Sequence, residues 1–312
     1  MSKNDWKKYS DNTEKIYLSR SGITELNWEG CPPGLTEIQL YRNEIIEMNW
    51  KGCPQSLTEI DLSYNKITKL NWEGCPQSLS KIYLYNNQIT YIVWDKCLQS
   101  LTNIDLSNNY ITLLDWERCP QSLTNIELYG NKIEEINWEG CPPGLTTIYL
   151  CDNEITEINW EGCPPGLTTI HLRGNEITKM NWIGCPSVLI EIYLNDNEIT
   201  EMNWEGCPSG LTRIYLDNNP ITKINWKYVP WDLKLQNEDL ANKYNEYKKS
   251  RDNIPDLPYQ CSTQRHKEFM KALTHTFLLP PKISGFKSPY YEFKLYENGG
   301  ISYRDAMKEM TS

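Results

Sequence analysis

Hydrophobic and polar positions follow one pattern of 22 residues, repeated from about residue 13 to residue 230. The unit reads L-x-x-I-x-L-x-x-N-x-I-T-x-x-N-W-x-G-C-P-x-x, and ten copies begin near residues 13, 35, 57, 79, 101, 123, 145, 167, 189 and 211. In the copy that begins at Leu57, the apolar Ile60 and Leu62 alternate with the polar Glu59 and Asp61. This alternation predicts a short strand at the start of each copy. Because the copies are nearly identical, we expect a stack of coils that each bury apolar side chains against their neighbours.

The second half of each copy has no helical period and contains Gly and Pro in most copies, so we expect extended or irregular chain with a single tight turn. Its apolar residues, Trp72 and Cys75 in this copy, are predicted to fill the back of the core. A tryptophan recurs every 22 residues from Trp6 to Trp226, and each indole can bury about 200 Å². The alternative is an exposed row of indoles that binds sugars or lipid, but such a row would favour aggregation.

An asparagine follows the predicted strand in nine copies, at Asn43, Asn65, Asn87, Asn109, Asn131, Asn153, Asn175, Asn197 and Asn219. Backbone groups that turn inside a coil are shielded from water and need partners. An Asn side chain offers two N–H donors and one acceptor. We therefore expect a structural ladder in which each Asn bridges its own turn and the next one.

The segment Leu57-x-x-Ile60-x-Leu62-x-x-Asn65 resembles the L-x-x-L-x-L-x-x-N signature of the leucine-rich repeat family, and nine of the ten copies carry it complete. The first copy departs from it, with Thr13 and Ser21 at the Leu and Asn positions. The P-x-x-L junction resembles short repeats of bacterial effector proteins, and the Trp-x-Gly-Cys-Pro half resembles repeats of large DNA viruses that infect amoebae. The resemblance implies an α/β solenoid, mostly β, coiled to the right, with a parallel sheet of ten strands on its concave face.

We divide the chain into an N-terminal cap (1–12), ten repeats (13–230) and a C-terminal cap or small module (231–312). The pattern is expected to stop at Gln236, which fails the Ile position. Residues 231–252 are predicted to form an amphipathic helix with an apolar side of Leu240, Tyr244 and Tyr247. A second helix is expected from Ser262 or Thr263 to residue 279, followed by a strand at residues 291–296.

The net charge of −10 argues against nucleic acid and against anionic membrane surfaces as partners, because both attract basic proteins. No run of about 20 apolar residues predicts a transmembrane helix. The first residues lack the apolar core of a secretion signal. We therefore expect an intracellular protein, in the cytoplasm (of the host cell if the source is viral).

Eleven cysteines could suggest disulfides, but nine of them share one repeat position, from Cys31 to Cys207. Without a secretion signal, reduced and buried thiols are the better interpretation. The 22-residue spacing does not bring mixed ligands together for a metal, and Cys261, His266 and His275 do not converge on one side of a helix. No metal or other cofactor is expected.

The variable positions on the predicted sheet are the candidates for binding, and they are rich in tyrosine and acidic residues. Tyrosine is common at protein interfaces, although it also suits plain strands. The interspersed carboxylates suggest a partner with a basic surface. The candidate binding residues are Tyr41, Tyr64, Tyr83, Tyr85, Tyr129, Tyr149, His171, Arg173, Tyr193, Tyr215, Asp61, Asp105 and Glu127.

These residues predict a non-catalytic module that binds a protein partner, in an oligomeric state left open. The alternative is an adaptor or enzyme whose C-terminal tail carries recruitment or activity, for example in a ubiquitin pathway. Two catalytic hypotheses have weaker support. Cys151 with His171 and Arg173 could form an activated thiol, and Asp61 with Asp105 could act as paired carboxylates. Both lie on what we expect to be an open, flat sheet without a pocket.

Overall fold

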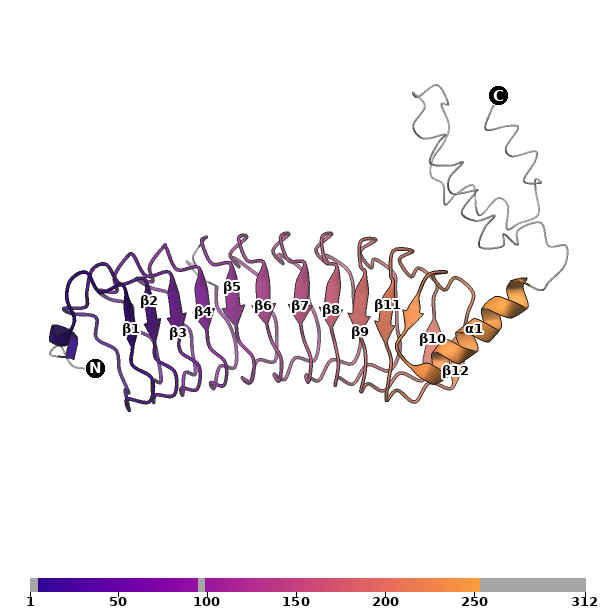
Figure 1. Cartoon of the computed structure of the whole chain (residues 1–312), viewed down its shortest axis with the longest axis horizontal. Coiled ribbons are helices and arrows are strands. Elements are labelled where there is room, and N and C mark those ends of the chain that lie inside the picture. The colour runs from indigo at the N-terminus through magenta and orange to yellow at the C-terminus, as the bar shows by residue number, and fades with distance from the viewer. Residues whose placement is uncertain (1–4, 95–98, 253–312) are drawn as a thin grey trace, which may run out of the picture. The chain divides into compact units, whose positions relative to one another are not determined.

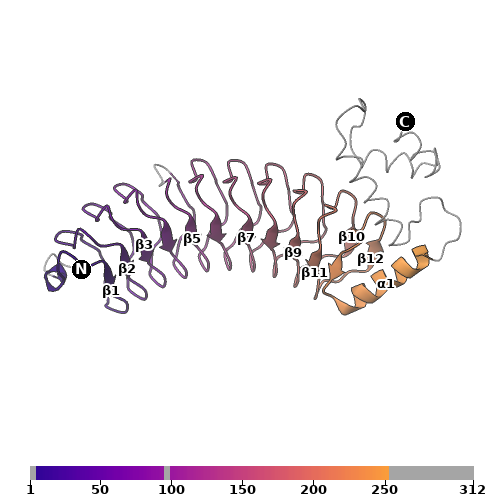
Figure 2. The same cartoon turned by 45° about the horizontal axis from the view of Figure 1, so that its top comes forward.

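The computed structural model describes residues 5–94 and 99–252 of the chain. The chain divides into two compact units after Glu238, and the repeats lie in the first. Figure 1 shows their strands side by side in one row, and Figure 2 shows each coil displaced from the one before it. The predictions made for residues 253–312, including the second helix, lie outside the described residues.

Each repeat contributes one strand of two or three residues to a parallel sheet in the order β1-β2-β3-β4-β5-β6-β7-β8-β9-β11-β13. A central isoleucine is buried in most strands and its two neighbours are half-buried, as the alternation predicts. A short 3-10 helix, η1 (Asp5–Lys8), precedes the sheet. The strands are β1 (Lys15–Tyr17), β2 (Glu37–Gln39), β3 (Glu59–Asp61), β4 (Lys81–Tyr83), β5 (Asn103–Asp105), β6 (Asn125–Glu127), β7 (Thr147–Tyr149), β8 (Thr169–His171), β9 (Glu191–Tyr193), β11 (Arg213–Tyr215) and β13 (Lys234–Leu235).

The sheet has eleven strands instead of the ten expected, because β13 extends it past the last predicted repeat. Earlier strands pair at an offset of 22 residues, but β13 pairs Leu235 with Ile214, an offset of 21. The last interval is one residue shorter than the repeat, so Leu235 occupies the Ile position that the 22-residue pattern assigned to Gln236. The expectation that the pattern stops at Gln236 was therefore wrong.

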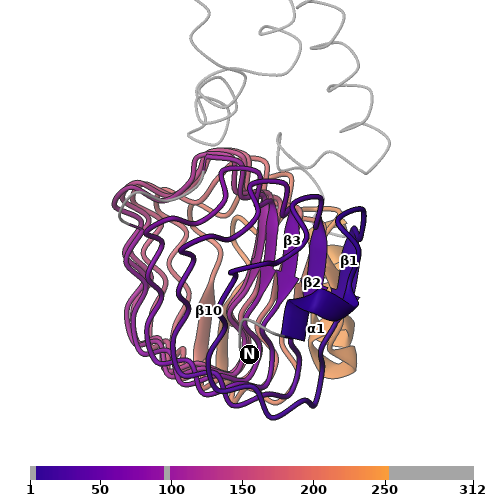
Figure 3. The same cartoon turned by 90° about the vertical axis from the view of Figure 1, so that its left-hand side faces the viewer.

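The back of the coil is partly extended and partly irregular, within the alternatives expected. Two short strands, β10 (Glu201–Asn203) and β12 (Lys223–Asn225), pair in parallel as a second sheet. Figure 3 shows β10 on the opposite side of the coil from β1, β2 and β3. Single bridges join other coils on this side, for example between Glu47 and Lys69. Neighbouring copies of the same sequence lie in the same register, which lets their backbones pair.

The tryptophans from Trp6 to Trp204 are buried, as predicted, whereas Trp226 and Trp231 are half-buried. Trp138 and Trp160 are each 1% exposed, and neighbouring indoles stack with centroids 6.1–6.5 Å apart at the closest pairs. From Trp6 to Trp182, the Nε1 of each repeated indole also donates to a backbone oxygen of the next coil, as Trp138 does to Asn159 at 2.7 Å. The buried Nε1 of Trp204 has no hydrogen-bond partner among the described residues. The indole therefore fills the core and links successive coils.

The asparagine ladder is present, but it joins each coil to the preceding one, whereas we expected the next. The Nδ2 of Asn131 donates to the carbonyl of Leu128 in its own coil and to that of Leu106 in the preceding coil. Its Oδ1 accepts the N–H of Ile111, also in the preceding coil. All three bonding positions of the amide are used, so the ladder fixes the stacking of the coils.

The described cysteines are free and are buried or half-buried. Burial raises the pKa of Cys31 and of Cys163 to about 12, so these thiols remain protonated and weakly reactive at neutral pH. After unfolding without reductant, we expect a thiol titration to find all eleven cysteines. The same titration after reduction is the control, and fewer than nine free thiols in the unreduced sample would contradict reduced repeat cysteines.

Past the sheet, the described part of the chain contains one α-helix, α1 (Glu238–Asp252), within the segment predicted to be helical. It starts later than residue 231, because β13 and a turn occupy the preceding residues. Leu240 and Tyr244 lie one helical turn apart and are both buried.

Candidate binding face

The side chains on either side of each buried isoleucine form one continuous surface, which we call the strand face. Its positions align across the sheet because the strands pair without slipping from β1 to β11. Asp105, Glu127, Tyr149 and His171 therefore stand at successive register positions on β5 to β8. Most of the candidates fall into three groups along this surface.

The first group, which we call the aromatic column, contains Tyr149, His171, Tyr193 and Tyr215. Its neighbouring ring centroids lie 4.5, 4.2 and 4.2 Å apart, with interplanar angles of 17°, 12° and 6°. Parallel strands at about 4.8 Å spacing bring identical positions to the stacking distance of planar rings. All four side chains are half-buried, so the column exposes ring edges on a rigid base.

Glu191 and Arg213 hold the C-terminal end of the column, and neither is among the candidates predicted from the sequence. The hydroxyls of Tyr193 and Tyr215 donate to Oε1 of Glu191 at 2.9 and 3.0 Å. The guanidinium of Arg213 lies on both carboxylate oxygens, at 2.9 and 3.0 Å. This ion pair could have been predicted from the sequence, because Glu191 and Arg213 occupy the same repeat position in neighbouring strands.

The charge of Glu191 is stabilised in this arrangement. Partial burial pushes its pKa upward, but hydrogen bonds from Tyr193, Tyr215 and Arg213 leave the pKa below its ordinary value of 4.5. Burial, and then the bond to Glu191, raise the pKa of Tyr193. The tyrosine therefore stays a hydrogen-bond donor at neutral pH.

Glu191→Gln should reduce the acid sensitivity of the fold. A carboxylate with a depressed pKa stabilises the folded state above its ordinary pKa, and this contribution is lost as pH falls below about 4.5 through the folded value. We expect the unfolding free energy of the wild type to drop more between pH 7 and pH 3 than that of Glu191→Gln. Urea unfolding measures both. Equal drops would contradict the role of Glu191, and Glu198→Gln, at an exposed position, is the control.

The surroundings of His171 and Cys151 do not favour an activated thiol. Burial lowers the pKa of His171, so its ring favours the neutral form that stacks between two tyrosines. Burial also raises the pKa of Cys151, the opposite of what a nucleophilic thiolate requires. Cys151 is also half-buried. Arg173, the third residue of that hypothesis, pairs with Asp196 at 2.7 Å.

The second group, which we call the tyrosine cluster, contains Tyr41, Tyr64 and Tyr85. Tyr64 lies 5.1 Å from each of the other two rings in edge-on geometry, and the guanidinium of Arg42 lies over Tyr41 and Tyr64 at 5.3 and 5.0 Å. Tyr64 has a φ of 55°, at a turn position occupied in later coils by Asn, Asp or Gly. A bulky residue costs free energy in this left-handed conformation, which favours a role for the ring on the surface.

The third group consists of the carboxylates Asp61, Asp105 and Glu127. None of the three has an ion-pair partner among the described residues, unlike Glu37, which pairs with Lys15, and Glu59, which pairs with Lys81. Asp105 and Glu127 are register partners on neighbouring strands. Two like charges at facing positions destabilise a sheet, and a cation supplied by a partner would offset that cost.

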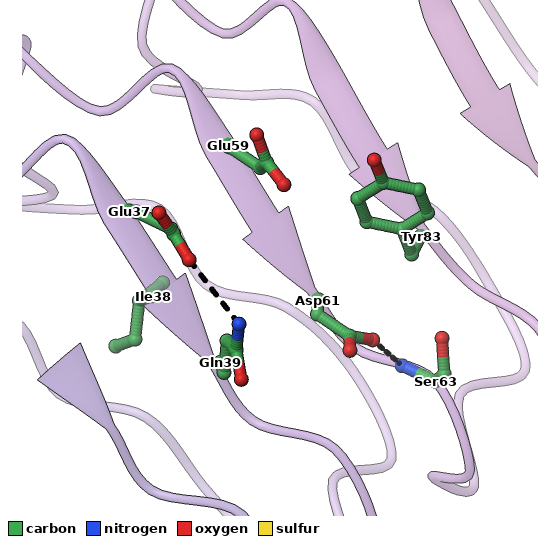
Figure 4. A pocket seen from close by; sticks show the side chains of 7 residues that line it. All are labelled: Glu37, Ile38, Gln39, Glu59, Asp61, Ser63 and Tyr83. Atoms are coloured by element: carbon green, nitrogen blue, oxygen red, sulfur yellow. Dashed lines mark hydrogen bonds between the residues drawn. The ribbon is translucent and has the colours of Figure 1, made fainter. Parts of the chain in front are cut away.

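Near Asp61 the face is hollowed into a shallow depression of 180 Å³, so our expectation of a flat surface was wrong there. Figure 4 shows its lining side chains, with Glu59 and Tyr83 above Asp61. They are Glu37, Ile38, Gln39, Glu59, Asp61, Ser63 and Tyr83. Asp105 does not line it, and Asp61 and Asp105 each accept the N–H of a serine two residues on, at 2.9 Å. The depression thus holds only one carboxylate of the pair proposed for hydrolysis.

Tyr129 lies two residues past the end of β6 and is 42% exposed. It belongs to none of the three groups by ring contact. Among the described residues, no three His, Cys, Asp or Glu side chains are grouped closely enough to hold a metal. No helix in the described part of the chain is long and apolar enough to cross a membrane.

The comparisons agree with this architecture. The sequence model of the Leucine Rich Repeat family matches residues 56–77. The functional domain of InlJ from Listeria monocytogenes, which includes a cysteine ladder, is 19% identical and matches 72% of this chain and 53% of its own, with a TM-score of 0.52. The leucine-rich repeat domain of APL1B is 19% identical and matches 75% of this chain and 71% of its own, with a TM-score of 0.60. No curated protein matches the sequence.

A third structure, of the Toll–Spatzle complex of Drosophila, is 18% identical and matches 72% of this chain, with a TM-score of 0.61. The match spans about half of the InlJ domain and 34% of the matched chain in that complex. The repeat, the family match and these structures together show that the array has the fold of a leucine-rich repeat solenoid. The resemblance to viral repeats stays a prediction.

Proposed function

We propose that the solenoid is a non-catalytic module that binds a protein partner on the strand face. The aromatic column is the observation that carries this proposal. Four half-buried rings are held in one stack by the sheet, and the last two are fixed further by Glu191. Rings that are already ordered lose little conformational entropy on docking, so their contact area contributes more fully to affinity.

The charges on the same surface support a basic partner. Asp61, Asp105 and Glu127 lie beside the aromatic groups without an ion pair among the described residues. Opposite charge on a partner would speed its association and select against acidic competitors. The similar Toll chain was solved in a complex with Spatzle, so a solenoid of this fold can carry a protein partner.

The free thiols of the repeats favour a reducing cellular compartment. Repeat cysteines that are reduced and weakly reactive suit a reducing environment. The proposal therefore places the module inside a cell, where its partner would also be found.

The proposal is tested by affinity capture from a cell lysate, with mass-spectrometric identification. We expect the full chain to capture a protein that is lost when Tyr149, Tyr193 and Tyr215 are all changed to Ser. The reason is that the variant removes three of the four rings of the column while leaving the buried core intact.

The matched control changes Tyr91, Tyr110 and Tyr228 to Ser, three tyrosines outside the strands of the main sheet. This control variant should capture the same protein as the wild type. Circular dichroism and urea unfolding must show that both variants remain folded. We call the variant with Tyr149, Tyr193 and Tyr215 changed to Ser the column variant. If the folded column variant still captured the protein, the strand face would not be the binding surface.

A further inference from the structure

We propose that Tyr149, the first ring of the aromatic column, receives an arginine side chain of the partner, with Glu127 and Asp105 as its hydrogen-bond acceptors. This inference rests on the proposed function and adds the chemistry of the partner: a protein segment that presents an exposed arginine to the strand face.

The geometry of the column leaves one face of Tyr149 without a stacked ring. His171 stacks on one side of Tyr149 at 4.5 Å and 17°. The other face is directed along the sheet toward β6, where the register partner is Glu127 and not an aromatic residue. A planar group inserted above β6 would therefore continue the stack at the spacing that the column already has.

The carboxylates continue the row in that direction. Glu127 and Asp105 occupy the next two register positions, on β6 and β5. The Oε1 of Glu127 accepts a long hydrogen bond of 3.3 Å from Asn125 on its own strand, so the carboxylate leans along β6 and does not bond to Tyr149. Neither acid has a cationic partner among the described residues, and their charges favour a cation beside the open ring.

Arginine fits this site better than lysine. Its guanidinium is flat, so it can stack on a tyrosine face while its N–H groups bond to carboxylates in the same plane. A lysine ammonium can supply the charge but cannot stack or bind two acceptors in a fixed fork.

The strand face already uses the same chemistry within the chain. Arg42 covers two rings of the tyrosine cluster, and Arg213 binds the carboxylate that anchors Tyr193 and Tyr215. Both of these aromatic groups have an arginine of their own. In the described part of the chain, the Tyr149 end of the column has the ring and the carboxylates but no such cation over the ring.

The test uses the full chain and a fluorescent peptide of alternating arginine and glycine, followed by fluorescence polarisation. Matched peptides replace arginine by lysine or by citrulline, which keeps the shape but removes the charge. We expect the arginine peptide to bind about tenfold more tightly than the lysine peptide, and the citrulline peptide not to bind measurably. Tyr149→Leu and Glu127→Gln should each weaken arginine-peptide binding about tenfold.

Two control variants separate this site from general attraction to an acidic protein. Tyr17→Leu removes a ring from the same strand position on β1, far along the sheet from the column. Glu154→Gln removes one exposed charge outside the sheet. Both should bind the arginine peptide as the wild type does. Equal binding of arginine and lysine peptides, or unchanged affinity in a folded Tyr149→Leu variant, would overturn the inference.

Failure of the arginine site and failure of the strand face as a binding surface give different results. If the column variant loses its captured protein but Tyr149→Leu and Glu127→Gln leave arginine binding unchanged, the strand face binds a partner by other chemistry. If the column variant loses nothing, the binding face itself is wrong, whatever the peptides do.

Discussion

Trp138→Ala is expected to lower the free energy of unfolding by about 4 kcal/mol, in the range observed when a buried aromatic side chain is truncated. Trp138 is 1% exposed, and its Nε1 donates to the carbonyl oxygen of Asn159 in the next coil at 2.7 Å. The variant therefore leaves a cavity and also removes a bond between coils. Because coils stabilise only their neighbours, damage in the middle of the stack weakens both halves.

Urea unfolding measures this loss. Tyr110→Ala is the matched control, because Tyr110 is an aromatic residue that is 49% exposed, and it should change stability by less than about 0.5 kcal/mol. If Trp138→Ala lowered the free energy of unfolding by less than about 1.5 kcal/mol, the buried indoles would not be a main source of stability.

Asn131→Ala is expected to cost about 3 kcal/mol, because it leaves buried backbone groups without partners. The N–H of Ile111 loses the acceptor that the structure gives it. The carbonyls of Leu106 and Leu128 each lose one of two donors, since Asn109 and Asn153 also bond to them. The orphaned N–H is thus the largest part of the expected loss.

Asn159→Ala is the control for Asn131→Ala. Asn159 is exposed, and its side chain accepts only the N–H of Glu161, two residues on. Its replacement should cost about 1 kcal/mol or less. If the two variants lost the same stability in thermal or urea unfolding, the buried ladder would not be what fixes the stacking of the coils.

The repeat determined the fold because it encodes both local structure and neighbour contacts. Alternation around Ile60 predicts the strand, and identical copies at a fixed spacing predict parallel pairing in register. The burial of the indoles followed from their size and number. The direction of the asparagine ladder could not be predicted, because one amide can reach the preceding or the following coil with the same sequence.

Features that depend on a single departure from the repeat were harder to predict. Leu235 enters the sheet because one residue is missing before it, and a search at a strict period of 22 cannot find that. The stacking of Tyr149 and His171 could be anticipated from their positions, but not the anchoring of Tyr193 by Glu191. That anchoring depends on which way the side chains lean along the strand, and a sequence pattern does not contain this information.

We propose that the aromatic column is part of the surface that binds the partner. The most direct test is calorimetric titration of the captured protein into the full chain and into the variant with Tyr149, Tyr193 and Tyr215 changed to Ser. We expect the folded variant to bind at least about a hundredfold more weakly, because several aromatic contacts at the interface are lost. An affinity within about threefold of the wild type would contradict it.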